Sequence, residues 1–317
     1  MGSYQPLNAL LQSAQSVAYD RLRLPHCQAR GVEVLLRRDD LLHPIYGGNK
    51  LFKLYFNLAQ ARQLGKTRLV SLGGPWSNHL HTLARMASEH GFAAKAIVRG
   101  ERPAQLSATL LDAQRWGMEL QFVSRQAYRA YAAGASPGIA DDDYFVPEGG
   151  ANELGRLGCE WLGQAIALSA SGNAAAICLP VGTGATMAGV IRGLAGALPT
   201  IGFSALKDDS AQSQIAMGLP TDRPWRLIWG FHGGGYGRRL PSAMMDFWRR
   251  FEREHTIALD PVYTLKMLWG INQLALAGYW RPGTTLIALH TGGIQGRRGF
   301  SAQIDWPSPS PLSPCEQ

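Results

Sequence analysis

The sequence has few cysteines and no uninterrupted apolar run of membrane-spanning length. Its four cysteines form no CxxC pair and no other metal-ligand spacing, so we expect no metal site. The longest apolar stretch, residues 174–206, is broken by Pro180, Arg192 and Pro199 and does not predict a transmembrane helix. The N-terminus lacks a basic segment followed by an apolar one, so we expect no signal peptide. These absences favour a cytoplasmic protein.

Lysine is also scarce. Only six of the 31 basic residues are lysines, so a reaction that needs a side-chain amine has six candidates. The net charge of +8 comes mostly from arginine and suits an anionic ligand or weak nucleic-acid binding equally well. With 317 residues, 46% of them apolar, the chain is long enough for one large domain or two modest ones.

Helical and strand-like patterns alternate along the chain, which predicts an α/β fold with parallel sheets covered by helices on both faces. Short apolar runs predict strands at residues 69–72, 94–98, 120–123, 144–146, 175–179, 201–206 and 286–290. Amphipathic spacing and capping residues predict helices at residues 51–61, 77–91, 106–116, 152–169, 185–198 and 261–278. The Pro- and Ser-rich end, residues 306–317, is predicted to be a flexible tail.

A lysine follows two glycines at residues 46–50 (Tyr-Gly-Gly-Asn-Lys). Glycines leave room for a planar ring beside an amine, so Lys50 is a candidate for Schiff-base formation with an aldehyde. The competing interpretation is a loop before a helix, with Lys50 and Lys53 as solvated charges on the first turn.

Two further motifs lie between a predicted strand and a predicted helix, where free backbone N–H groups bind anions. Residues 73–79 (Gly-Gly-Pro-Trp-Ser-Asn-His) suit a carboxylate or phosphate, or else provide only an N-cap through Ser77. Residues 179–186 (Leu-Pro-Val-Gly-Thr-Gly-Ala-Thr) lack the Gly-Lys-Ser/Thr of a P-loop and the third glycine of a dinucleotide site. A phosphate monoester therefore fits this second turn better than a dinucleotide, and a turn without a ligand is the alternative.

Two C-terminal motifs complete the set. Asp260 and Pro261 are typical of the start of a helix, which leaves Tyr263 and Thr264 available to face a site. Residues 290–293 (His-Thr-Gly-Gly) follow a predicted strand, and parallel sheets bind ligands at such strand ends.

Together, the five motifs resemble the fold-type II pyridoxal-phosphate (PLP) enzymes, in the branch that holds D-cysteine desulfhydrase and 1-aminocyclopropane-1-carboxylate (ACC) deaminase. The resemblance runs from residues 38–40 (Arg-Asp-Asp) to residues 290–293, with the motifs in the family's order. It implies a tryptophan synthase β-like fold of two three-layer αβα domains with parallel sheets, the smaller inserted in the larger. The large PLP-binding domain would comprise residues 1–52 and 146–305, and the small domain residues 53–145.

The resemblance also implies how the cofactor is held. Lys50 would carry PLP as an internal aldimine and later move the Cα proton. Asn78 would bond the phenolic oxygen of the ring, and Thr264 would face the pyridine nitrogen. Phosphate binding would fall to five neighbouring residues: Gly182, Thr183, Gly184, Ala185 and Thr186.

The substrate site implied by the resemblance lies at the start of the helix after residue 77. Ser77, Asn78 and His79 would hold the substrate carboxylate, and Ser77 would also exchange protons. Trp76 stands where relatives carry a glutamine in the substrate pocket. The two active-site tyrosines would be Tyr236 and Tyr263.

The implied reaction is α,β-elimination from a small amino acid, with D-cysteine giving pyruvate, ammonia and sulfide. The alternative is ACC deamination to 2-oxobutanoate and ammonia. Thr264 favours the first, because ACC deaminases carry a glutamate there and a neutral hydroxyl supports a weaker electron sink. Relatives are commonly dimers, so the resemblance implies a homodimer.

Three other interpretations stay open from the sequence. Gly182 and Gly184 also suit a nicotinamide-dependent oxidoreductase. The net charge suits a nucleic-acid binder, although the arginine pairs are scattered and have no interleaved aromatic residues. Trp76 and Phe52 depart from the family pattern, which leaves a PLP-binding protein without catalysis as the third.

Overall fold

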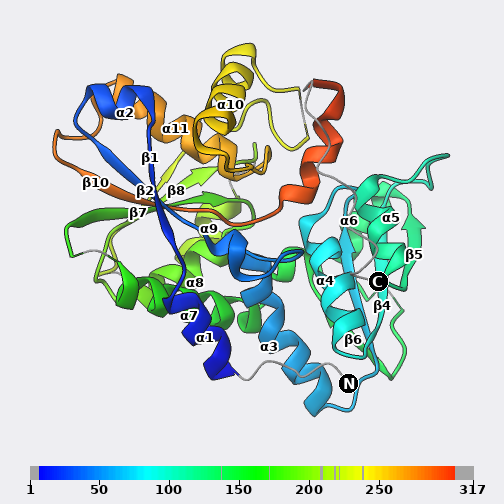
Figure 1. Ribbon diagram of the computed structural model, residues 1–317. Helices are drawn as coiled ribbons and strands as arrows, with labels where there is room; N and C mark the ends of the chain where they lie inside the picture. Colours follow the sequence, from blue (N-terminus) through cyan, green and yellow to red (C-terminus); the bar gives the residue numbers. More distant parts are fainter. Residues whose placement is uncertain are drawn as a thin grey trace.

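The computed structural model describes residues 7–303, except residues 137, 171, 208, 209, 218, 221 and 238. The predicted tail, residues 306–317, lies outside the described residues. The described chain forms two β-sheets with helices around both, one sheet on each side of the view in Figure 1. Within the described residues, no helix is long and apolar enough to cross a membrane, and no cluster of His, Cys, Asp and Glu could hold a metal ion.

The larger sheet has six strands in the order β1-β2-β10-β7-β8-β9. All neighbouring strands run parallel except β1 and β2, which pair antiparallel at one edge. The predicted parallel sheets are thus found, and the antiparallel edge strand β1, which was not predicted, is added where a short segment reverses the chain before β2. The bounds are β1 (Tyr19–Leu22), β2 (Glu33–Arg37), β7 (Ala174–Val181), β8 (Thr200–Ser204), β9 (Trp225–Ile228) and β10 (Thr285–Leu289).

The smaller sheet has four parallel strands in the order β5-β4-β3-β6. Its strands all come from one continuous segment of the chain, while the strands of the larger sheet come from before and after it. The bounds are β3 (Arg68–Gly73), β4 (Ala93–Arg99), β5 (Met118–Val123) and β6 (Asp143–Val146).

Helices cover both faces of both sheets, as expected for parallel strands buried on two sides. The α-helices are α1 (Leu7–Gln15), α2 (Pro25–Ala29), α3 (Asn49–Gln63), α4 (Asn78–Glu89), α5 (Ala108–Arg115), α6 (Arg125–Ala132), α7 (Glu153–Ser169), α8 (Ala185–Leu194), α9 (Ser210–Ala216), α10 (Ser242–His255) and α11 (Thr264–Leu276). Short 3₁₀ segments are η1 (Asp39–Leu42), η2 (Glu148–Gly150) and η3 (Ile294–Gln303).

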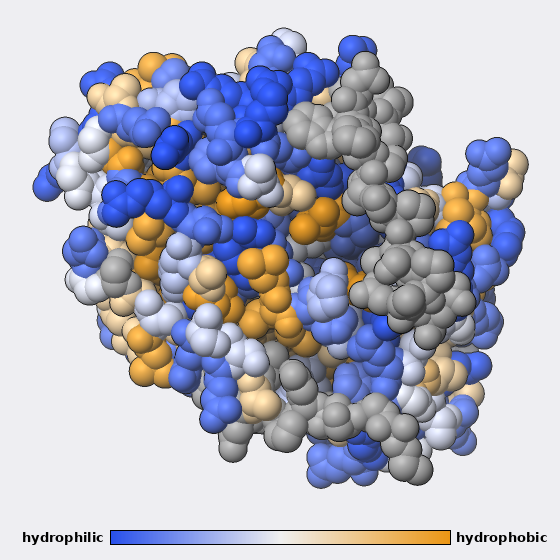
Figure 2. Space-filling view, in the orientation of Figure 1, coloured by the Kyte–Doolittle hydropathy of each residue, from blue (hydrophilic) through white to orange (hydrophobic). Residues whose placement is uncertain are grey.

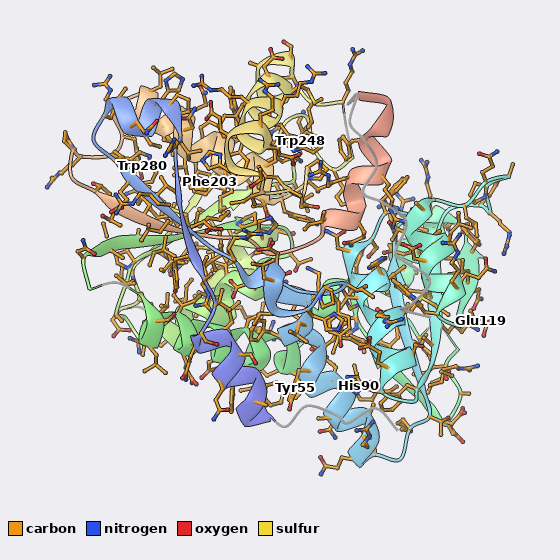
Figure 3. All side chains as sticks on the ribbon, viewed as in Figure 1. Tyr55, His90, Glu119, Phe203, Trp248 and Trp280 are labelled. Carbon is orange, nitrogen blue, oxygen red and sulfur yellow. The ribbon has the colours of Figure 1, made fainter. Side chains whose placement is uncertain are left out.

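The hydrophobic core divides at the larger sheet. Side chains of α10 and α11 pack on one face around Phe203, Trp248 and Trp280 (Figure 3), and α7 and α8 pack on the other. In the smaller sheet, successive residues alternate between faces: Leu69 packs with α3 and α4, and Val70 packs with Tyr128 of α6. Polar residues cover most of the molecular face shown in Figure 2, with apolar side chains exposed in scattered patches.

Two predicted helices have different ends in the structure. The helix predicted from residue 261 begins at Thr264, because the Asp260 carboxylate accepts hydrogen bonds from the N–H groups of Val262 and Tyr263 and stabilises a turn before the helix. The helix predicted to reach residue 198 ends at Leu194, where Ala195 turns the backbone left-handed with a φ of 51°.

Candidate active site

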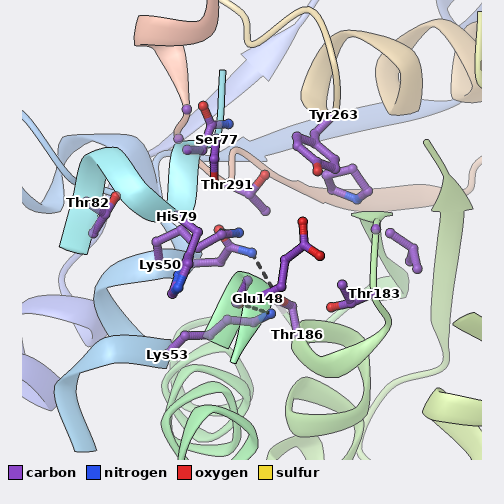
Figure 4. Close-up of a pocket in the computed structure, with 18 of the residues that line it drawn as sticks. Lys50, Lys53, Ser77, His79, Thr82, Glu148, Thr183, Thr186, Tyr263 and Thr291 are labelled. Atoms are coloured by element: carbon purple, nitrogen blue, oxygen red, sulfur yellow. Dashed lines mark hydrogen bonds between the residues drawn. The ribbon is translucent and has the colours of Figure 1, made fainter. Parts of the chain in front are cut away.

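A cavity of about 350 Å³ lies where the two sheets meet, lined by the ends of α3, α4 and β7 and by the loops around Gly149 and Gly292 (Figure 4). Its volume suits a small cofactor with a small substrate. Because the lining comes from both halves of the chain, folding brings residues 45 and 295 to one place.

The lysine motif reaches the cavity through a close backbone contact. Gly48 has a φ of +109°, and a Cβ there would lie 2.2 Å from the carbonyl oxygen of Thr291. The same oxygen accepts a 3.4 Å hydrogen bond from the Asn49 N–H. Only glycine permits this contact, which joins the first predicted motif to the last and directs the first turn of α3 at the cavity.

Two lysines of α3 line the cavity one helical turn apart. Burial, together with the positive charge of Lys53, lowers the pKa of Lys50 to about 7. The Lys50 Nζ lies 3.3 Å from the Asn49 Oδ1, and the Lys53 Nζ donates a 3.0 Å hydrogen bond to the Gly149 carbonyl. About half of the Lys50 amine is therefore neutral at pH 7, and the neutral form can attack a carbonyl carbon.

The turn before α8 has the features of a phosphate site. Gly184 precedes the helix in a left-handed conformation, and no described side chain caps the first N–H groups of α8. Thr183 and Thr186 add hydroxyl groups to the cavity wall, and the Asn49 amide donates a 2.8 Å hydrogen bond to the Thr186 hydroxyl. A dianionic phosphate at this turn would meet free backbone donors and the cation of Lys53.

The start of α4 forms the opposite wall. Ser77 is the N-cap, and its hydroxyl accepts a 3.2 Å hydrogen bond from the Leu80 N–H. His79 is buried and its Nε2 lies 2.8 Å from the Ser71 hydroxyl. Burial and the charges of Lys50 and Lys53 lower the pKa of His79 well below its usual value, so the ring is neutral.

Asn78 is held by polar partners from the C-terminal half. Its amide group donates to the Asp260 carboxylate over 3.3 Å, and its carbonyl oxygen accepts a 2.6 Å hydrogen bond from Gln295. Burial raises the pKa of Asp260 to about 6, although its hydrogen bonds act in the opposite direction. These contacts fix α4 of the smaller sheet against the loops of the larger one.

Two tyrosines and a buried lysine form the remaining wall. Tyr236 and Tyr263 line the cavity, and the Tyr236 hydroxyl donates to the Trp76 carbonyl over 3.1 Å. Lys266 lies behind them, with its Nζ 3.0 Å from the carbonyl oxygens of both Ala205 and Gly235. Lys266 thus holds the segment that carries Tyr236 against the end of β8.

The structure brings most predicted site residues together, and leaves three off the cavity wall. Those on the wall are Lys50, Ser77, Asn78, His79, Gly182, Thr183, Gly184, Thr186, Tyr236 and Tyr263. Trp76 does not line the cavity, because its ring packs against Gly299 of η3. Ala185 points into the protein at the start of α8, and Thr264 is fully buried behind Tyr263.

Sequence reasoning missed several residues that line the cavity. They are Lys53, Thr82, Arg99, Glu148 and Gln295, while Asn49 and Thr291 lie in predicted motifs without a predicted role of their own. Lys53 carried a usable signal, since it follows Lys50 at the spacing that places both on one helix face. Arg99 and Glu148 carried none, because only the meeting of strand ends from the smaller sheet with the larger sheet brings them to the cavity.

These residues fit an aldehyde cofactor that carries a phosphate. An amine with a lowered pKa lies in the cavity, and a helix start with uncapped N–H groups and the hydroxyls of Thr183 and Thr186 lie beside it. The fold and the site thus define an α/β enzyme that binds a phosphorylated aldehyde on a lysine.

Comparison with known proteins identifies the family. The model of the pyridoxal-phosphate dependent enzymes matches residues 17–292, so the chain belongs to this family and uses PLP as its cofactor. The chain is 28% identical over 305 residues to the D-cysteine desulfhydrase of Yersinia pestis (strain Pestoides F), covering 86% of this chain and 90% of that protein. It is 27% identical over 299 residues to a putative ACC deaminase of Pyrococcus horikoshii, covering 84% and 86%.

Solved structures agree with the expected fold. A crystal structure of an ACC deaminase homologue matches with a TM-score of 0.76 and 25% identity, over 90% of this chain and 92% of that one. An O-ureido-L-serine synthase matches with a TM-score of 0.66 and 14% identity, which shows likeness of fold alone. The predicted fold class, a fold-type II PLP enzyme, is confirmed, and so is the prediction of a PLP-dependent enzyme.

Proposed function

We propose that the protein catalyses α,β-elimination from a small amino acid, with the D-cysteine desulfhydrase reaction as its model. The observation that carries this proposal is the placement of the Lys50 amine, with its lowered pKa, between the α8 turn and the start of α4. When bound, PLP acidifies the substrate Cα–H and accepts the electrons that this proton leaves behind. The D-cysteine desulfhydrase relative of this chain supports the same reaction class.

The residues of the site would have different roles in this reaction. Lys50 would hold the cofactor and, once released by the substrate, take the Cα proton as a neutral amine. The start of α4 at Ser77 would bind the substrate carboxylate, since a helix N-terminus stabilises negative charge. His79 would stay neutral and support Ser71 and the strand behind it. Tyr236 and Tyr263 would shape the substrate side of the cavity.

A second candidate is ACC deamination, which the name of the Pyrococcus horikoshii relative favours. The family resemblance separates the two at Thr264, which would face the pyridine nitrogen with no charge where ACC deaminases carry a glutamate. In the structure Thr264 is buried next to Tyr263 and does not itself line the cavity. An uncharged partner leaves the ring a weaker electron sink, which suits departure of a thiolate better than opening of a cyclopropane.

Absorbance spectroscopy and product analysis test the proposal. Purified holoenzyme should absorb as a PLP protein, and Lys50→Ala should abolish the Schiff-base band. Lys53→Ala is the matched control one turn away, and it should keep the band while binding PLP less tightly. D-Cysteine should yield pyruvate and sulfide, while ACC should yield less 2-oxobutanoate. Retention of the band in Lys50→Ala, or its loss only in Lys53→Ala, contradicts the assignment.

Three further points belong to this proposal. The segment that carries the smaller sheet, residues 53–145, would be a small domain inserted in a PLP-binding domain of residues 1–52 and 146–305. The functional unit would be a homodimer in the cytoplasm. Size-exclusion chromatography with light scattering tests the dimer.

A further inference from the structure

A second cavity lies beside the catalytic one and is rich in arginine. It is lined by Pro75, Arg99, Gly100, Glu101, Ser124, Arg125 and Arg129 and has a volume of about 890 Å³. We call it the arginine cavity. Arg99 lines both cavities, so its side chain forms the border between them.

The strand order explains why Arg99 stands at this border. β3 and β4 are parallel neighbours, and Gly73 at the end of β3 pairs with Val98 of β4. The residue after Val98 therefore lies beside the loop that leads to the start of α4. The Arg99 Nη2 is only 3.6 Å from the position that a Cβ on Gly74 would occupy. The guanidinium group thus lies next to the site proposed for the substrate carboxylate.

Three arginines, Arg99, Arg125 and Arg129, line this cavity together, and no salt bridge to a carboxylate is found for them among the described residues. Arg99 instead lies over the ring of Tyr128, with its Cζ 5.7 Å from the ring centroid. Glu101 is the one acidic residue among those that line the arginine cavity. Other exposed arginines divide between the two cases: Arg250, for example, pairs with Glu254 over 2.7 Å, whereas Arg226 contacts the Tyr279 hydroxyl.

The backbone adds to the positive potential. α6 begins at Arg125 beside the cavity, and Ser124 caps it through a 3.2 Å hydrogen bond from the Ala127 N–H. Its first turn contains no acidic residue, so the positive end of the helix dipole is uncompensated. Across the two cavities, five lysine and arginine side chains face two carboxylates, those of Glu101 and Glu148. A cleft lined mainly by one sign of charge raises the local concentration of ligands of the opposite sign.

We infer that the arginine cavity binds an anionic group at the far end of the substrate side chain, so that the enzyme prefers amino acids with a distal carboxylate or phosphate. The inference rests on the proposed elimination and specifies its substrate class. A side chain that leaves the catalytic cavity past Arg99 would place its terminal anion among the guanidinium groups of Arg125 and Arg129. Arginine suits both anions, because its planar fork pairs with two oxygens at once.

Paired serine esters test the inference. O-Succinylserine and O-acetylserine lose their acyl groups as carboxylates by the same C–O cleavage, and each consumes one water to give pyruvate and ammonia. They differ in a distal carboxylate. O-Phosphoserine, which would release phosphate, separates preference for phosphate from preference for carboxylate. Both enantiomers of each ester should be assayed.

The expected result is a higher kcat/KM for O-succinylserine or O-phosphoserine than for O-acetylserine. The double variant Arg125→Gln/Arg129→Gln should lower this ratio about tenfold, because two charge-assisted contacts are lost. Arg102→Gln is the matched control, since Arg102 lies on the Phe122 ring and lines neither cavity. A ratio that is the same in the wild-type enzyme and the double variant overturns the inference.

A binding measurement separates this inference from the proposed reaction. Titration of holoenzyme with inorganic phosphate in a calorimeter should give binding that the double variant weakens about tenfold and Arg102→Gln does not change. If no ester is turned over but this binding is observed, the elimination is wrong and the anion site stands. If D-cysteine is turned over, while phosphate binding is absent and the ester ratio does not change, the arginines are exposed charges without a ligand.

Discussion

The side-chain amide of Asn49 donates a 2.8 Å hydrogen bond to the hydroxyl of Thr186, across 137 positions of sequence. Asn49 is the first residue of α3, next to the proposed cofactor lysine, and Thr186 is in the first turn of α8 at the proposed phosphate site. This bond fixes the distance between the two ends of the site. A cofactor bound at both ends needs that distance to be constant.

We therefore predict that Asn49→Ala weakens PLP binding without removing it. Loss of one neutral hydrogen bond has a net effect of about 1 kcal/mol, which corresponds to a roughly fivefold rise in the dissociation constant for PLP. Fluorescence titration of apoprotein with PLP measures this constant. Thr186→Val should give a similar rise, and the double variant should show less than the sum of the two effects. Strictly additive effects would mean that the two side chains act independently.

The lowered pKa of Lys50 predicts how cofactor loading depends on pH. Only the neutral amine attacks an aldehyde, and burial with the charge of Lys53 places half-neutralisation at about pH 7. The rate of PLP incorporation into apoprotein should thus rise with pH through about 7 and then level off. Stopped-flow absorbance measures it.

The same shift affects stability in the same direction. Between about pH 7 and the usual lysine value, the unfolded chain binds a proton that the folded apoprotein does not, so the stability of the apoprotein rises with pH over this window. If the rate of PLP incorporation instead reaches half of its maximum near the pKa of a free lysine, Lys50 is solvated.

Lys266 is predicted to stabilise the segment that carries Tyr236. Lys266→Met keeps the length of the side chain but leaves the carbonyl groups of Ala205 and Gly235 without this donor. We expect a loss of about 2–4 kcal/mol in the free energy of unfolding, since each buried unsatisfied group costs about 1–3 kcal/mol. Urea denaturation of the holoenzyme measures the loss. Lys207→Met, at an exposed lysine, is the control and should change stability by less than about 0.5 kcal/mol.

A buried ion pair gives a prediction outside the site. Glu252 of α10 accepts two hydrogen bonds from the Arg297 guanidinium, and also bonds the Trp248 indole and the Leu259 N–H. Glu252→Ala leaves a buried cation unpaired and should lower the free energy of unfolding by about 3–5 kcal/mol. Glu254→Ala, two positions along, breaks an exposed pair with Arg250 and should cost less than about 1 kcal/mol. Thermal denaturation of both variants compares them, and equal losses would refute the role of burial.

The sequence by itself determined the local elements and the chemistry-bearing motifs. The pattern of an apolar strand, then glycines, then an amphipathic helix located β3, β7, α4 and α8 within a few residues. It could do so because the spacing of apolar residues and the capping of helices depend only on neighbouring residues. The Ser77 cap was predicted from the hydroxyl before an amphipathic run, and it forms in the structure. The edge strands β1 and β9 were not predicted, because a strand of four residues shows little alternation of apolar and polar residues.

Tertiary structure alone decided which motifs share a cavity and what each residue contacts there. Trp76 belongs to the right motif, yet its ring turns to Gly299, because η3 packs over the start of α4. Arg99 carries no local signal, yet the parallel pairing of β3 with β4 places it at the edge of the catalytic cavity. The low pKa of Lys50 likewise depends on burial and on Lys53. The dielectric environment and the direction of a side chain arise from packing between distant segments of the chain. A short stretch of sequence therefore does not predict them.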